Sequence, residues 1–214
     1  IPLVAKGAPE TDASVVDANY ILGIYSATNV IAADFEEGTG SVSPGLNHPI
    51  TGTTVIQNNV WYHAAVTFDS NGDYKLYLNG LLEASVSLGS SVWPQGNSTQ
   101  HSALGTMLKS DGTNTSPSGG YFAGVLDEVH IWNYARTESE IQTNLNLEIT
   151  TPQANLLARW SLDEGLGTTV NGSAGTTFNG TIQSTGCGWV FGAPFNISFV
   201  APEAPSNLVA TSGN

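Results

Sequence analysis

The chain has 214 residues, of which 40% are hydrophobic and only 11% are charged, and its formal net charge is −13. This composition excludes an intrinsically disordered chain, and no uninterrupted apolar run is long enough to cross a bilayer. The 5 lysine and arginine residues, against 18 aspartate and glutamate residues, exclude the basic surface that binds nucleic acid or anionic membranes. Such acidity suits the solubility of a secreted protein, or the binding of a hard cation such as calcium.

Strand-like segments follow one another along the chain at the spacing that is typical of a β-sandwich. Most are rich in β-branched and aromatic residues, and turn residues separate nearly all of them. In chain order they are Pro2–Lys6, Asn19–Tyr25, Val30–Phe35, Thr53–Gln57, Trp61–Asp69, Tyr74–Asn79, Leu82–Ser87, His101–Leu108, Tyr121–Trp132, Leu156–Leu162, Thr177–Ile182 and Gly188–Phe191. The sequence therefore predicts an all-β fold, in which two antiparallel sheets pack as a jelly-roll sandwich. Trp61, Trp132 and Trp160 are predicted to lie in its core.

One short helix is predicted to interrupt this pattern. The residues from Thr137 to Glu140 (TESE) match a capping box. In that motif the threonine hydroxyl accepts a hydrogen bond from the N3 amide, and the glutamate side chain accepts one from the N-cap amide. The sequence therefore predicts a helix over residues 137–145.

The segment Tyr121–Trp132 carries two adjacent carboxylates, Asp127 and Glu128, among strongly apolar residues. Because side chains alternate along a strand, Asp127 is predicted to share one face with Val125 and Val129. Glu128 is then predicted to lie on the opposite face. A carboxylate among such neighbours needs a partner, because burying an unpaired charge is costly. The sequence leaves three kinds of partner open for Asp127: a metal ion, backbone N–H groups or an arginine.

Two motifs carry a family resemblance. From residue 122 the sequence reads F-x-G-x-L-D-E-V-x-I-W-N-x-A and is followed by the predicted helix. This pattern resembles the closing strand of laminin-G-like modules in the concanavalin A-like lectin/glucanase superfamily. Residues 58–85 (NNVWYHAAVTFDSNGDYKLYLNGLLEAS) resemble the central hairpin of the same modules. The resemblance implies a concanavalin A-like jelly roll, but it implies less about function, because one fold hosts many functions.

The resemblance also implies a calcium site at Asp127. In concanavalin A-like glucanases, an aspartate in a D-x-V-x-(I/V) pattern on the last strand holds a structural calcium ion, and the residues DEVHI from Asp127 align with that pattern. Calcium takes about six to eight oxygen ligands. Asp163 and Glu164 are predicted to supply some of them from the adjacent terminal strand. The alternative is that Asp127 accepts backbone amides or pairs with Arg136 or Arg159.

Three side chains in or beside loops are candidates for binding a sugar: Trp93, His101 and Tyr121. Trp93 lies in a loop rich in proline, glycine and asparagine, and Tyr121 follows a glycine-rich loop. An exposed aromatic ring stacks on the C–H groups of a sugar, while neighbouring amides and hydroxyls bind its hydroxyl groups. The alternative is that these rings fold back over the sandwich as a lid, because large aromatic side chains are usually buried. The predicted partner is a glycan or a cell-surface molecule.

The motifs of hydrolytic enzymes are missing from the chain. The glucanase branch uses an E-x-D-x-x-E strand, which sets two carboxylates about 5 Å apart. Neither Glu10 nor the pair Glu36–Glu37 continues into that pattern. The sequence therefore predicts a non-catalytic carbohydrate-binding or adhesion module, secreted or on the surface of a bacterium. The second hypothesis is a structural module that forms homo-oligomers or filaments by pairing open sheet edges, and a glycoside hydrolase is the third.

Residues 1–200 are predicted to form one laminin-G-like domain, although the strands that open such modules are missing before Ile1. Either those strands lie outside this chain, or residues 156–192 fill their places in the sheet. The second option is suggested by W-x-L-D-E-G-x-G-T from residue 160, which resembles the opening of such a module. Residues 201–214 resemble a linker into a fibronectin type III domain. We therefore expect this chain to be a piece of a longer, modular protein.

Overall fold

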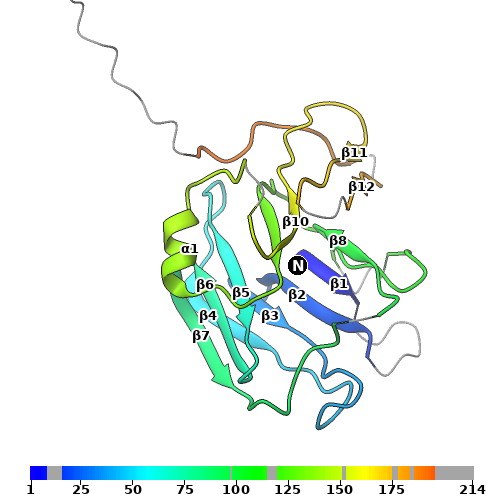
Figure 1. Cartoon of the computed structure of the whole chain (residues 1–214). Coiled ribbons are helices and arrows are strands. Elements are labelled where there is room, and N and C mark those ends of the chain that lie inside the picture. The colour runs from blue at the N-terminus through cyan, green and yellow to red at the C-terminus, as the bar shows by residue number, and fades with distance from the viewer. Residues whose placement is uncertain are drawn as a thin grey trace, which may run out of the picture.

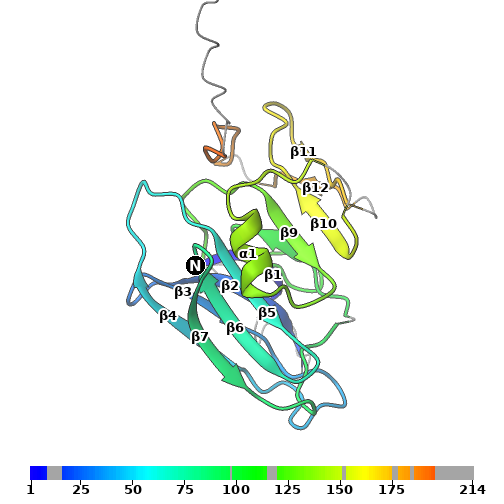
Figure 2. The same ribbon diagram turned by 60° about the vertical axis from the view of Figure 1, so that its left-hand side comes forward.

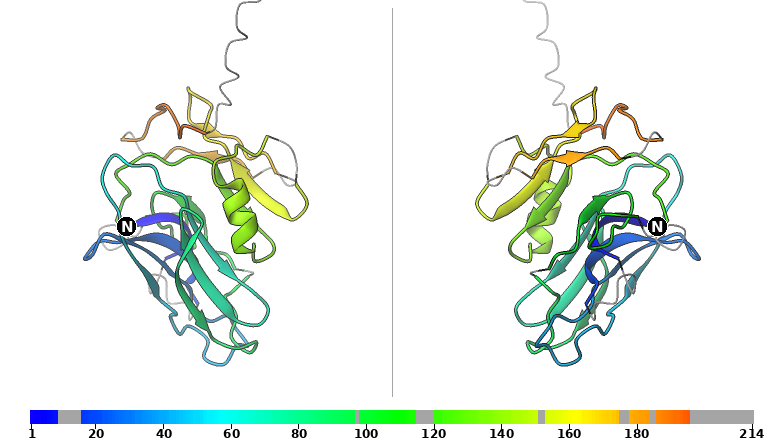
Figure 3. Two further views of the ribbon diagram at one scale, coloured as in Figure 1. Left: turned by 90° about the vertical axis from the view of Figure 1, so that its left-hand side faces the viewer. Right: turned by 90° about the vertical axis from the view of Figure 1, so that its right-hand side faces the viewer.

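The computed structural model describes residues 1–8, 16–96, 98–114, 120–150, 153–174, 178–183 and 186–195. In these residues two antiparallel sheets pack against each other (Figure 1), as both views of Figure 3 also show. The first sheet, in the order β4-β3-β2-β1-β8, consists of β1 (Pro2–Gly7), β2 (Ala18–Tyr25), β3 (Val30–Asp34), β4 (Ile50–Val55) and β8 (Ser102–Leu104). The second, in the order β5-β6-β7, consists of β5 (Ala64–Phe68), β6 (Asp73–Leu78) and β7 (Leu81–Ser87). The predicted all-β sandwich is confirmed.

The main core lies between these sheets and follows from the alternation of side chains along β3 and β6. Its most buried members, each at most 3% exposed, are Ile31, Ala33, Phe35, Tyr74, Leu76 and Leu78. The ring of Phe35 packs edge-on against Tyr74, with the ring centroids 5.1 Å apart. Such aromatic side chains bury large apolar areas, and each burial stabilises the fold by about 2 kcal/mol or more. The core therefore fixes β3 and β6 as the rigid centre of the sandwich.

One helix and two short ribbons complete the described part of the chain (Figure 1). The ribbons pair β9 (Val129–Trp132) with β10 (Leu156–Trp160), and β11 (Thr169–Val170) with β12 (Gly180–Thr181). The predicted helix is confirmed as α1 (Glu138–Asn144), and both hydrogen bonds of its capping box are present. The side chain of Gln142 donates to the carbonyl of Gly80 (3.0 Å), which fixes α1 beside the β6–β7 turn (Figure 2). Within the described ranges, no helix has the length and hydropathy that crossing a bilayer requires.

Some sequence predictions about single segments are wrong. The strand predicted over Tyr121–Trp132 is reduced to β9, and residues 121–128 form a loop. Glu128 has a φ of 46°, in the left-handed region, so the alternation of side chains stops there. Trp61 is 40% exposed and not part of the core, because it precedes β5. The segment Gly188–Phe191 is not a strand, and Phe191 is fully exposed (100%).

The two sheets meet along one side of the sandwich, where β4 and β7 are the outer strands of different sheets. Glu83 of β7 bridges them, because its Oε2 accepts from the amides of Thr53 (2.7 Å) and Thr54 (2.9 Å) on β4. The hydroxyls of both threonines also donate to the same carboxylate (3.1 and 2.6 Å). A second chain can pair with an edge strand by forming hydrogen bonds to its unpaired N–H groups. Glu83 therefore occupies the part of β4 that a second copy would use.

Asp34, at the end of β3, makes the stability of the fold depend on pH. Asp34 lies opposite Ile21 of β2 in the sheet register, and its Oδ1 accepts from the amide of His48 (2.9 Å). Burial raises the pKa of Asp34 from its ordinary 3.8 to about 6, and the negative charge of Glu36 adds to this effect. The native state therefore binds the proton more tightly than the unfolded state does. For this group, stability is highest at low pH and is lost as the pH rises through about 6.

We expect the substitution Asp34→Asn to raise the free energy of unfolding near neutral pH by about 1 kcal/mol. This figure is roughly a third of the full linkage energy, because the carboxylate remains partly exposed. The asparagine oxygen still accepts from the amide of His48. The gain should vanish near pH 4, where the wild-type carboxyl is protonated in the native state. Urea unfolding of both proteins across this range measures it, and an advantage that is constant with pH contradicts the prediction.

Candidate functional site

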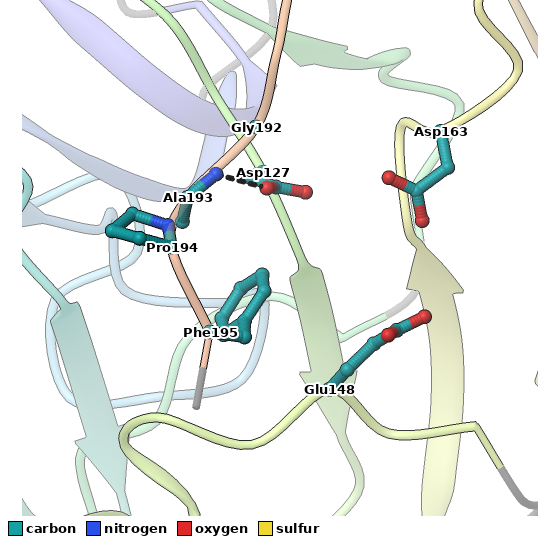
Figure 4. Close-up of a pocket in the computed structure, with 7 residues that line it drawn as sticks. All are labelled: Asp127, Glu148, Asp163, Gly192, Ala193, Pro194 and Phe195. Atoms are coloured by element: carbon teal, nitrogen blue, oxygen red, sulfur yellow. Dashed lines mark hydrogen bonds between the residues drawn. The ribbon is translucent and has the colours of Figure 1, made fainter. Parts of the chain in front are cut away.

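An acidic pocket of ≈ 250 Å³ lies where the loop before β9 meets the residues after β10. It is lined by Asp127, Glu148, Asp163 and the segment Gly192–Phe195, which we call the C-terminal strap. The register explains this meeting, because Val129 at the start of β9 pairs with Trp160 at the end of β10. Figure 4 shows the carboxylates of Glu148 and Asp163 pointing toward each other, and Asp127 in contact with the strap.

Asp127 attaches the C-terminal strap to the sandwich. Its Oδ2 accepts from the amide of Ala193 (2.6 Å), and its Oδ1 accepts from the amide of Glu128 (2.9 Å). The approach is so close that an ideal Cβ on Gly192 would lie 2.1 Å from Oδ2, so a side chain there would displace the carboxylate of Asp127. Burial raises the pKa of Asp127, and the nearby negative charge of Asp163 raises it further, although the bond from Ala193 lowers it.

Glu128, the second member of the acidic pair, is bound by an arginine. Arg159 of β10 donates from Nε to Oε2 (3.1 Å) and from Nη2 to Oε1, so the pair is bidentate. His130 Nε2 lies 2.9 Å from Oε2, and the amide of Ile149 donates to the same oxygen (3.4 Å). Burial alone would raise the pKa of Glu128, but the bonds from His130 and Arg159 outweigh it and lower the pKa. Glu128 therefore remains ionised, and the positive charge of Arg159 balances its negative charge.

Three carboxylates in this region are close enough to share a metal ion. Oxygen atoms of Glu128, Glu148 and Asp163 all lie within 4.8 Å of one another. Nη2 of Arg159 reaches Oε1 of Glu148 (3.4 Å) as well as Glu128, and Asp127 lines the pocket beside Glu148 and Asp163. The cluster of Glu128, Glu148 and Asp163 is able to hold a cation.

The structure brings together two of the three carboxylates that the sequence suggested for a metal site. Asp127 and Asp163 line the acidic pocket, whereas Oε1 of Glu164 accepts from the amide (2.6 Å) and side chain (3.2 Å) of Asn171. Glu148 was missed, because its neighbours in the sequence carry no ligand pattern. Only the packing of the segment between α1 and β10 places it at the pocket.

The three candidate sugar-binding side chains are exposed: Trp93 and His101 lie in the connection between β7 and β8, and Tyr121 lies between β8 and β9. Trp93 is 40% exposed and Tyr121 is 59% exposed, and His101 is also exposed. Trp93 lies against a glycine turn, since an ideal Cβ on Gly40 would be 3.8 Å from Cζ2 of the indole. His101 lies against another turn, with its Cε1 3.3 Å from an ideal Cβ on Gly112. These rings are therefore accessible to a ligand.

Comparison with known families identifies the fold. A family model for laminin-G-like domains, described as concanavalin A-like lectin/glucanases superfamily, matches residues 4–142. The chain belongs to this superfamily. The match covers both sandwich sheets and the first part of α1, whereas Glu148, Asp163 and the strap lie beyond it. The superfamily includes both lectins and glucanases, so membership alone does not distinguish a binding protein from an enzyme. That distinction depends on the residues of the site.

Two solved structures align with this chain at low sequence identity. The chain is similar to a Bacteroides ovatus protein described as a candidate carbohydrate-binding protein, with 19% identity and a TM-score of 0.54. The alignment covers 86% of this chain and 49% of the other, so this chain spans about half the length of that protein. An S-layer domain-containing protein from Clostridium thermocellum aligns with 19% identity and a TM-score of 0.32, over 65% of this chain and 63% of its own. No curated protein sequence matches the chain significantly.

Proposed function

We propose that the chain is a non-catalytic carbohydrate-binding module of a larger bacterial protein, secreted or displayed on the cell surface. The observation that carries this proposal is the exposed indole of Trp93, which lies on a hydrogen-bonded loop of a lectin-like fold. The backbone of Trp93 is fixed, because the amide of Gly38 donates to its carbonyl (2.8 Å). A flat ring held in this way presents an apolar face to the C–H groups of a sugar. His101 and Tyr121 are further exposed rings that we assign to secondary contacts.

The burial of the acidic pair Glu36–Glu37 supports binding without chemistry. A retaining glycosidase needs two carboxylates about 5 Å apart that both reach the sugar. Glu36 and Glu37 are 3% and 2% exposed. Glu36 accepts from the amides of Asp17 (2.5 Å) and Ala18 (3.0 Å), and Glu37 accepts from the amide of Ser43 (2.7 Å). These side chains stabilise loops and are too buried to act on a bound glycan.

The acidic pocket fits a structural calcium ion. Carboxylate oxygens are the hard ligands that calcium prefers, and Asp127, Glu148 and Asp163 face the pocket. The negative charge of Asp163 raises the pKa of Asp127 beyond the effect of burial, so a cation between them would stabilise both ionised forms. Calcium would supply positive charge there. It would also link the loop before β9 to the residues after β10.

Self-assembly through sheet edges is the second candidate role. Glu83 already accepts from the two amides of β4 that a second copy would pair with, and two hydroxyls reinforce this contact. This arrangement disfavours pairing at the β4 edge. We therefore rank assembly below glycan binding.

We expect Trp93→Ala to weaken glycan binding about tenfold or more, because a stacked aromatic ring at the centre of a contact contributes about 2 kcal/mol. A glycan array identifies a ligand, and isothermal titration with that ligand measures the loss. Trp61→Ala is the matched control, since Trp61 is also 40% exposed but lies on another loop. Equal losses in both variants, or no binding across plant, algal and animal glycans, would contradict the proposed function. Hydrolysis of β-glucans by the wild-type chain would contradict its non-catalytic part.

A further inference from the structure

Glu37 is a fully buried carboxylate at the base of the turn that faces Trp93. It lies three residues after the end of β3 and is 2% exposed. Its Oε2 accepts from the hydroxyl of Ser41 (2.8 Å) and the amide of Ser43 (2.7 Å), and His48 Nε2 lies 2.8 Å from Oε1. One side chain thus ties three positions of the segment 38–48 to the end of β3. Removing such a carboxylate leaves the hydroxyl of Ser41 and the amide of Ser43 without this acceptor.

These bonds continue from Glu37 to Trp93 through Ser41. The hydroxyl oxygen of Ser41 accepts from the amide of Trp93 (3.4 Å), and the hydroxyl also lies within bonding distance of the carbonyl of Ser91 (3.1 Å). The backbones are joined as well, since Glu37 and Pro94 form an antiparallel bridge. The turn 38–41 (GTGS) and the loop that carries Trp93 are therefore held together from the inside of the protein.

The turn also supplies the surface against which the indole rests. Gly40 has a φ of 90°, which favours glycine, and an ideal Cβ there would lie only 3.8 Å from Cζ2 of Trp93. The amide of Thr39 donates to Oε1 of Gln95 (2.9 Å), which adds a second link between the turn and the Trp93 loop. We call the turn 38–41 together with Trp93 the Trp93 platform. Its shape depends on the turn keeping its present position.

We propose that Glu37 is the positioning residue of the Trp93 platform. It does not touch the ligand, and it orders the turn so that the indole is presented to a sugar ring in one orientation. A side chain that is ordered before binding loses less conformational entropy on binding, and this preorganisation increases affinity. The sugar-binding part of this inference rests on the proposed function, whereas the positioning of Trp93 does not.

The test compares Glu37→Met with Glu37→Gln. Methionine has a similar volume but no acceptor, whereas glutamine retains an oxygen for Ser43 and can donate its amide to His48. The signal of Trp93 is isolated by subtracting the emission of each protein carrying Trp93→Phe. In Glu37→Met we expect red-shifted Trp93 emission and stronger quenching by acrylamide, and a glycan affinity lowered about tenfold. Glu37→Gln should restore both readouts most of the way.

The outcomes separate this inference from the proposed function. Unchanged emission and quenching of Trp93 in a folded Glu37→Met protein overturns the positioning role, whatever the glycan affinity. A changed Trp93 signal without glycan binding by the wild type supports positioning and overturns the proposed function. If Glu37→Met does not fold, Ser41→Ala tests the same chain of bonds, because it removes the hydroxyl that links Glu37 to the amide of Trp93 and leaves the carboxylate in place. Wild-type Trp93 fluorescence in that variant also overturns the inference.

Discussion

Replacing Arg159 with methionine is expected to lower the free energy of unfolding by about 3–5 kcal/mol, which is the usual cost of leaving one member of a buried ion pair alone. The side chains of Arg159 and Glu128 are only 9% and 5% exposed. Without the guanidinium, Glu128 retains His130 and the amide of Ile149 but loses its bidentate partner. Arg159 also donates to Ser173 (2.9 Å), so the segment that follows β11 is expected to loosen as well. Urea unfolding at neutral pH measures the loss.

An exposed ion pair provides the control for this prediction. Lys75 and Asp73 lie 3.6 Å apart with side chains 38% and 37% exposed, so Lys75→Met should cost less than about 1 kcal/mol. The double substitution Glu128→Leu with Arg159→Met should recover much of the loss, because it leaves no buried charge. If Arg159→Met costs no more than Lys75→Met, the ion pair is not the structural link between β9 and β10 that we describe.

The cost of Arg159→Met should also depend on pH. Burial opposes ionisation of Glu128, but His130 and Arg159 lower its pKa in the native wild type. A group with a lowered native pKa stabilises the fold above its unfolded pKa, and this contribution is lost as the pH falls through the native value. The difference between wild type and variant should therefore be largest near neutral pH and shrink in acid. A difference that grows as the pH falls would be incompatible with this sign.

The body of the sandwich could be predicted from the sequence because its determinants are local and repetitive. The residues Ile31, Ala33 and Phe35 alternate with partly polar neighbours, and this period specifies a strand with one face in the core. The helix was equally predictable, because Thr137 and Glu140 form the capping box within one turn. Each of these signals lies within a few residues and needs no knowledge of the rest of the fold.

The acidic pocket could be predicted only in part, because its geometry depends on distant segments. A single positive φ at Glu128 ends the strand pattern, and the residue type gives no warning of it. Arg159 was considered as a partner for Asp127, yet the β9–β10 register brings it to Glu128. The strap contributes Gly192, whose lack of a side chain allows the contact with Asp127. No local pattern contains this information.

Calcium is expected to raise the melting temperature of the protein after removal of bound metal with EDTA. At a concentration about one hundred times its dissociation constant, an ion that binds only the native state adds about 2.7 kcal/mol, which corresponds to roughly 5–10 °C for a domain of this size. Magnesium should be less effective, because it demands closer octahedral geometry than loop carboxylates provide. Sodium at matched ionic strength should have little effect, which excludes screening of the net charge of −13 as the cause.

Asp163→Asn and Glu164→Gln decide which carboxylates hold the ion. Asp163 lines the pocket and is exposed, so its replacement removes a ligand charge without removing a structural hydrogen bond. We expect it to abolish most of the calcium-dependent gain, while stability without calcium stays the same or rises, because repulsion of Asp127 is relieved. Glu164 accepts from Asn171 outside the pocket, so Glu164→Gln should keep the gain. If Glu164→Gln loses the calcium-dependent gain and Asp163→Asn keeps it, Glu164 is a ligand and Asp163 is not. If neither EDTA nor calcium changes the melting temperature of the wild type, the proposed calcium site is wrong.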